Sequence, residues 1–117
     1  WWNKDFLKLS EKARAIVQDR NHTLLLSLAS VWEIQIKVQL GKLTIPVALA
    51  ELLQKQQAAN QIELLPIALP HILALENLPP HHRDPFDRLL VAQAQIENIP
   101  LLSGDSLLSS YAVEVIW

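Results

Sequence analysis

The chain has 117 residues, enough for one domain, and half of them (50%) are hydrophobic. Its formal net charge of −2 argues against a broadly basic nucleic-acid surface, so contact with a polyanion would depend on local Lys and Arg side chains and on bound cations. The absence of cysteine excludes disulfides, thiolate metal sites and cysteine nucleophiles.

No segment has the length of a membrane span. The longest nearly apolar run, 24–32, is interrupted by Ser27 and Ser30 and is far shorter than the roughly 18 residues that a span needs. No basic region followed by an apolar stretch marks a secretory signal. We therefore expect a cytoplasmic protein without a membrane partner.

Taken in chain order, the hydrophobic pattern predicts helices that alternate with short strands. Ser10 can cap a first helix, and the continuously apolar run 23–29 is typical of a strand covered on both faces. Ser30 and Glu33 have capping-box spacing, so we expect a second helix that begins at Ser30 and stops at Gly41.

The second half of the chain continues the alternation. Pro46 begins the next predicted helix, and 62–67 predicts an edge strand, because Pro66 has no N–H to donate to a ladder. The remaining predicted elements are a short helix at 72–76, a helix around Asp87, and strands at 99–103 and 113–117. Alternating strands and helices predict an α/β fold with a parallel sheet.

Three acids, Glu33, Asp87 and Asp105, lie at predicted helix starts. In a parallel α/β sheet these starts share an edge with the strand ends, and ligands bind in the crevice outside that edge. Carboxylates crowded there repel one another, and a divalent cation relieves the repulsion. Together with the hydroxyls of Ser30 and Ser103 they form a hard oxygen set, which favours Mg²⁺ or Mn²⁺ over zinc.

Each acid also has a purely structural interpretation. Glu33 can be a capping-box partner, Asp84 an N-cap before a proline, Asp87 a first-turn acid and Asp105 a cap after a turn. Taken singly, each is more often structural than catalytic. The joint pattern favours a shared metal site.

Other chemistries lack their motifs. The chain has only two glycines, which leaves no Gly-rich phosphate loop and no Gly-x-Ser-x-Gly elbow. His81 and His82 are adjacent in a proline-rich stretch, which predicts a surface loop rather than a zinc site. A phosphoacceptor receiver domain also clusters acids at strand ends, but this chain has Ser-Gly-Asp at 103–105 where such a domain would carry a lysine.

Three motifs, in this order and spacing, resemble those of a known family. Ser-x-Trp-Glu at 30–33, His-Arg-Asp-Pro-Phe-Asp-Arg-Leu-Leu-Val-Ala-Gln-Ala at 82–94 and Leu-Leu-Ser-Gly-Asp at 101–105 are similar to those of a PIN domain of the VapC type. The resemblance covers essentially the whole chain. It implies a single PIN-like domain over 1–117, built as a three-layer α/β/α sandwich around a central parallel sheet.

The resemblance also implies an Mg²⁺- or Mn²⁺-dependent endoribonuclease, the toxin of a type II toxin–antitoxin system. Its implied partners are an RNA substrate, a cognate antitoxin and a second copy in a homodimer. The family's second, third and fourth acids, catalytic and metal-binding, correspond to Glu33, Asp87 and Asp105. Supporting roles are implied for Ser30, Asp84 and Ser103, and contact with an RNA phosphate for Arg88.

The chain departs from the family at its first residues. The family begins with a central strand that ends in an aspartate, whereas this sequence begins at Trp1-Trp2, and Asp5 follows that pair in the loop before the first helix. We therefore expect the domain to be N-terminally incomplete, without its first strand and first acid, or the strand's place to be filled in another way. A catalytically inactive PIN-like module that binds RNA or an antitoxin stays open as the alternative.

Overall fold

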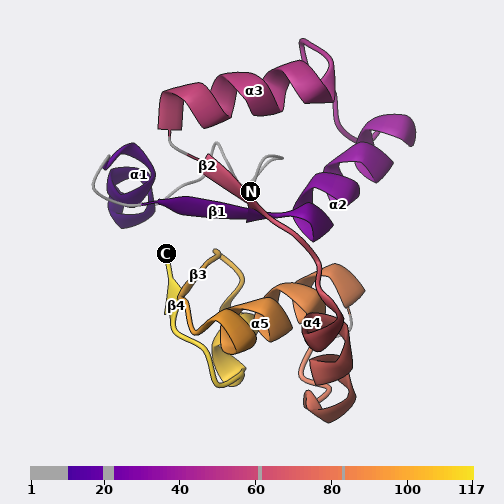
Figure 1. Cartoon of the computed structure of the whole chain (residues 1–117), viewed down its shortest axis with the longest axis vertical. Coiled ribbons are helices and arrows are strands. Elements are labelled where there is room, and N and C mark those ends of the chain that lie inside the picture. The colour runs from indigo at the N-terminus through magenta and orange to yellow at the C-terminus, as the bar shows by residue number, and fades with distance from the viewer. Residues whose placement is uncertain (1–10, 20–22, 61, 83) are drawn as a thin grey trace.

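The computed structural model describes residues 11–19, 23–60, 62–82 and 84–117. Helices and short parallel strands alternate along them, so the predicted α/β class is confirmed (Figure 1). The predictions on Trp1, Trp2, Asp5 and Ser10 lie outside these residues.

The elements are α1 (Glu11–Gln18), β1 (Leu24–Ser27), α2 (Leu28–Gln39), α3 (Leu49–Asn60), β2 (Ile62–Leu65), α4 (Leu69–Ala74), η2 (Leu75–Asn77), α5 (Pro85–Glu97), β3 (Leu101–Leu102), η3 (Ser106–Ser110) and β4 (Val115–Ile116).

The described strands pair in two short parallel ladders instead of one continuous sheet. β1 pairs with β2, with Leu24 opposite Ile62, and β3 pairs with β4, with Leu101 opposite Val115. One half of the molecule contains β1 and β2 with α1, α2 and α3, and the other contains β3 and β4 with α4 and α5 (Figure 1). The two ladders therefore belong to different halves of the molecule.

Helix α2 begins earlier than the capping-box pattern predicts. Its N-cap is Ser27, whose Oγ accepts a hydrogen bond from the backbone N–H of Ala29 at 3.0 Å. Ser30 consequently lies inside the first turn and Glu33 lies beyond it. Both serines could cap a helix, but the Ser27 hydroxyl also donates to a side chain from the other half of the molecule, and this distant partner decides the boundary. The helix ends before Gly41, as predicted. The backbone of Gly41 has a φ of +73°, a conformation that favours glycine.

Other boundaries move by two or three residues. α3 begins at Leu49 rather than at Pro46, and α4 begins at Leu69 rather than at 72. β3 and β4 each cover two residues of their longer predicted runs. The order of the elements is as predicted, so these shifts change no connection.

Helix α5 begins and ends at strong local signals. The carboxylate of the N-cap Asp84 accepts hydrogen bonds from the backbone N–H groups of Phe86 (2.8 Å) and Asp87 (3.4 Å), and a proline takes the first helical position. The C-cap Asn98 has a left-handed φ of 54°, which asparagine tolerates. Four consecutive residues, Val91 to Ala94, are buried, so neighbouring elements cover the middle of this helix on all sides.

A buried polar network joins the two halves. The side chain of Gln93 on α5 is 2% exposed, and its Oε1 accepts the hydrogen bond from the Ser27 hydroxyl where β1 passes into α2. Its Nε2 donates to the carbonyl of Pro66 (3.2 Å), which follows β2, and lies 3.3 Å from Nδ1 of the buried His71 on α4. Because buried polar groups without partners are costly, these bonds select one position of α5 against β1 and β2.

The apolar core is divided between the halves. One cluster gathers around α5, and a second group of buried residues lies on α2 and the first ladder. The members are Leu78, Val91, Leu108 and Tyr111 in the cluster, and Leu26, Ala29, Ile34 and Ile62 in the other group. Trp32 of α2 lies outside both groups, with 60% of its surface exposed. Along the described part of the chain, no helix combines the length and apolarity that crossing a bilayer requires.

The network makes a testable prediction. Gln93→Ala should lower the free energy of unfolding by about 2–4 kcal/mol, because it leaves buried polar groups unpaired and opens a cavity. The control is Gln95→Ala, an exposed glutamine on the same helix, which should change that free energy by less than about 0.5 kcal/mol. Urea unfolding followed by circular dichroism measures both, and equal effects would contradict the network's role.

Candidate metal centre

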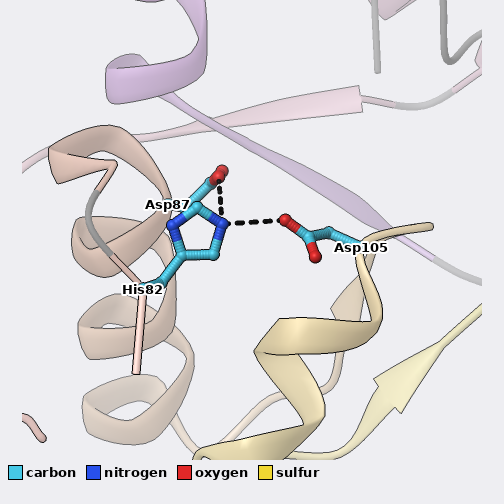
Figure 2. A group of neighbouring side chains, drawn as sticks. All are labelled: His82, Asp87 and Asp105. Atoms are coloured by element: carbon cyan, nitrogen blue, oxygen red, sulfur yellow. Dashed lines mark hydrogen bonds and ion pairs between the residues drawn. The ribbon is translucent and has the colours of Figure 1, made fainter. Parts of the chain in front are cut away.

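Three side chains from separate segments meet beside the start of α5: His82, Asp87 and Asp105 (Figure 2). One potential ligand atom from each lies within 4.8 Å of the other two. The imidazole Nε2 of His82 is 2.8 Å from Oδ2 of Asp105 and 3.3 Å from Oδ2 of Asp87. Two of the three predicted acids are therefore brought together, with a histidine between them.

The start of α5 positions Asp87. Capping by Asp84 holds the first turn, and Asp87 is the third residue of the helix. Its carboxylate projects from the helix end where the positive pole of the helix dipole lies. The helix start thus aims one carboxylate at the cluster and places a second, that of Asp84, nearby.

A tight turn after β3 positions Asp105. Ser103 Oγ accepts a hydrogen bond from the backbone N–H of Asp105 (3.1 Å), and Asp105 Oδ1 accepts one from the N–H of Leu107 (3.0 Å), which caps η3. Gly104 allows the turn to approach the C-terminal residue closely, since a Cβ there would lie 2.9 Å from the indole of Trp117. The structural interpretation of Asp105 as a cap is confirmed, and its other oxygen still faces the cluster.

His82 is the member that the sequence analysis missed. It lies in the predicted loop, but its side chain is only 14% exposed, and its backbone N–H donates to the hydroxyl of Tyr111 (2.8 Å). Its Nδ1 accepts a hydrogen bond from the backbone N–H of Asp84 (3.0 Å), so the neutral ring carries its proton on Nε2, facing Asp105. The available signal was its place two residues before the N-cap, where a side chain can fold over the first turn.

The carboxylate of Asp87 carries the electrostatic strain of the cluster. The pKa of Asp87 is raised from 3.8 to about 6, chiefly by partial burial and then by the charge of Asp84, with smaller increases from Glu33 and Asp105 and an opposing effect of His82. An ionised Asp87 is therefore disfavoured beside its neighbours. A bound cation would remove this penalty.

His82 and Asp105 stabilise one another's charged forms. The hydrogen bond with Asp105 raises the pKa of His82, partial burial opposes the rise, and the neighbouring carboxylates support it. Burial alone would raise the pKa of Asp105, but the hydrogen bond from His82, the N–H of Leu107 and the charge of His82 together lower it. The proton on Nε2 of His82 lies between the carboxylates of Asp105 and Asp87 and partly offsets their repulsion.

The other predicted site residues lie outside the group of three, and each has contacts of its own. Glu33 is a quarter exposed, forms an ion pair with Lys37 (Oε2 to Nζ 3.8 Å), and acts on Asp87 through its charge without belonging to the group of three. Ser30 lines a cavity between the halves. Arg88 donates to the carbonyl oxygens of Leu78, Pro79 and His82 and so ties the preceding loop to α5, while its contact with an RNA phosphate stays a prediction.

The donor set fits a divalent cation. Asp87 and Asp105 offer carboxylate oxygens, which Mg²⁺ and Mn²⁺ prefer, whereas Nε2 of His82 carries a proton and holds the two carboxylates in place. Burial is the largest cause of the raised pKa of Asp87, the neighbouring carboxylates add to it, and a cation would offset both effects. A metal would be held by residues that begin α5 and follow β3.

The shifted pKa gives a stability prediction. Because the folded-state pKa of Asp87 lies above its unfolded value of 3.8, the folded protein binds more protons between about pH 4 and 6, and stability falls as pH rises through that window. The shift of roughly two units corresponds to about 2.7 kcal/mol, which solvent screening reduces to about 1 kcal/mol.

Asp87→Asn should therefore raise the free energy of unfolding of the metal-free protein by about 1 kcal/mol at pH 8 and change it little at pH 4. Glu114→Gln, which removes an exposed carboxylate, is the matched control and should have no such dependence. Thermal unfolding in EDTA across this pH range measures both. If Asp87→Asn is instead less stable than the parent protein at pH 8, the ionised carboxylate of Asp87 does not destabilise the folded state.

The chain was compared with family models and with curated proteins. A family model described as PIN domain matches residues 5–114, nearly the whole chain. A comparison with curated proteins finds no match.

Proposed function

The chain belongs to the PIN domain family, and on that premise we propose that it is an Mg²⁺- or Mn²⁺-dependent endoribonuclease. PIN domains are generally nuclease domains that use divalent metals. The observation that carries the proposal is the meeting of His82, Asp87 and Asp105 at a site where negative charge is in excess. The three acids that the PIN resemblance assigns to catalysis contribute to this excess together with Asp84.

In the proposed mechanism Asp87 and Asp105 hold the metal, and Glu33 contributes charge from α2. A divalent cation at this site would activate a water molecule and offset the charge on the pentavalent phosphate. Ser103 positions Asp105 by bonding its N–H, and Asp84 positions Asp87 by capping the helix. His82 holds a proton at Nε2 beside both carboxylates and keeps them in place before the metal binds.

The cleavage test uses unstructured RNA. With Mg²⁺ or Mn²⁺ the protein should cut it, chelation should stop the cutting, and Asp87→Asn should reduce it by at least about a hundredfold, because an amide is a weaker ligand of similar shape. Glu114→Gln should cut normally. A fold that survives in Asp87→Asn, by circular dichroism, assigns the loss to chemistry. Undiminished cleavage in EDTA or in Asp87→Asn would refute the metal mechanism.

We further propose that the biological role is that of the toxin in a type II toxin–antitoxin pair, as a homodimer. The acidic cluster supports this, because an antitoxin peptide that presents an arginine could pair with Asp87 and Asp105 through charge-assisted hydrogen bonds. Expression of the chain alone should then arrest growth, and light scattering at micromolar concentration should give the mass of a dimer. A strict monomer would remove the dimer proposal.

The cavity between the halves supports the expectation of a further strand. It has a volume of about 370 Å³, and its lining includes Leu25 of β1, Leu101 of β3 and Leu90 of α5. Among the described residues β1 pairs only with β2 and β3 only with β4, so each strand has one edge without a ladder partner. We propose that an extended apolar segment ending in an aspartate occupies this cavity, joins the ladders and supplies a further acid.

The test is to add such a segment ahead of Trp1. The extended protein should melt at a higher temperature, bind Mn²⁺ more tightly and cut RNA faster than the 117-residue chain, because both ladders and the metal gain a partner. A version with Asn in place of the terminal Asp should keep the added stability but not the added metal affinity. If the 117-residue chain equals the extended form in all three measurements, the proposed occupant is wrong.

A further inference from the structure

An exposed aromatic contact lies on the two helices that carry Glu33 and Asp87. Trp32 is 60% exposed, and its ring packs edge to face on Phe86, with centroids 5.2 Å apart and planes at 77°. Trp32 precedes Glu33 on α2, and Phe86 precedes Asp87 on α5. The aromatic pair therefore bridges the two helices that carry these acids.

A surface hollow lies next to this pair on the Phe86 side, and Trp32 stands outside its lining. Phe86 forms part of its wall, and its volume is about 450 Å³, within the range of ligand pockets. The remaining lining residues are Glu33, Ile36, Lys37, Leu40, Lys42, Asp84 and Pro85. The wall of the hollow thus combines apolar side chains with two acids, Glu33 and Asp84, and with two lysines, Lys37 and Lys42.

The two lysines of the hollow differ in whether they are paired, and this bears on which ligand the hollow can bind. Lys37 is paired with Glu33, whereas the exposed Lys42 has no ion-pair partner within the described part of the chain. An anionic strand that reaches the metal centre is repelled by its carboxylates, so it needs attachment points that do not depend on net charge. Stacking on an exposed aromatic ring provides one, and an unpaired lysine beside it provides a contact for one phosphate.

We propose that Trp32, Phe86 and Lys42 form a subsite for one unpaired nucleotide next to the scissile phosphate of RNA, with the base stacked on the exposed face of Trp32 and a phosphate on Lys42. This rests on the proposed nuclease function and adds the residues that select an accessible base. Phe86 holds the indole by its edge contact and leaves a ring face for the base.

Binding is measured by fluorescence anisotropy with a labelled single-stranded RNA 12-mer and Mn²⁺, in an Asp87→Asn background so that the strand stays intact. Trp32→Ala should weaken binding about tenfold and Trp32→Phe should restore most of the affinity, since stacking needs an aromatic face. The control is Leu73→Ala, which removes an exposed apolar side chain on α4. It should leave the affinity unchanged.

A second strand of the same length with abasic riboses tests stacking directly. The Trp32→Ala loss should disappear on this strand. In a salt series, Lys42→Gln should reduce the slope of log affinity against log salt by about 0.7, the value for one phosphate of a single strand, whereas Lys55→Gln on α3 should not.

Unchanged affinity in Trp32→Ala, or an equal loss on the abasic strand, would overturn the subsite. A changed oligomeric state of Trp32→Ala by light scattering would assign Trp32 to a protein interface and overturn it as well. RNA binding that shows the expected pattern, without cleavage by either the 117-residue chain or the form extended ahead of Trp1, would refute the proposed nuclease and leave the subsite standing.

Discussion

A single buried amide, that of Gln93, determines how the two halves of this molecule meet. It accepts from Ser27, donates to the carbonyl of Pro66 and lies beside the buried His71, so one side chain connects the β1–α2 junction, the segment after β2 and helix α4. The start of α5 lies two turns from this amide, and its position relative to α2 follows from these bonds.

The centre that this arrangement creates is unfavourable for the fold and useful for chemistry. Burial and neighbouring carboxylates raise the pKa of Asp87, so its ionised form weakens the metal-free protein. His82 partly offsets the repulsion by placing a proton between Asp87 and Asp105. The same excess of negative charge would attract a divalent cation. A metal site therefore accounts for the repulsive carboxylates that the fold keeps at the start of α5.

Local signals in the sequence predicted most of the fold, and distant partners explain the rest. The cap at Asp84, the glycine after α2 and the order of helices and strands depend on neighbouring residues, and all agree with the structure. Ser27 replaced Ser30 as the cap of α2 because its hydroxyl bonds to Gln93, 66 residues away in the chain. His82 was missed for the same reason, since Asp105 and the Tyr111 hydroxyl approach it only in the folded chain.

The most direct test of the metal centre is a crystal structure of the protein with Mn²⁺, in which anomalous scattering locates the ion. We predict an anomalous peak with carboxylate oxygens of both Asp87 and Asp105 at roughly 2.1 Å, as expected for a hard divalent cation, and no such peak in Asp87→Asn crystals grown in the same solution. Crystals of the parent protein in which Mn²⁺ binds elsewhere, with the two carboxylates still bonded only to His82, would contradict the account.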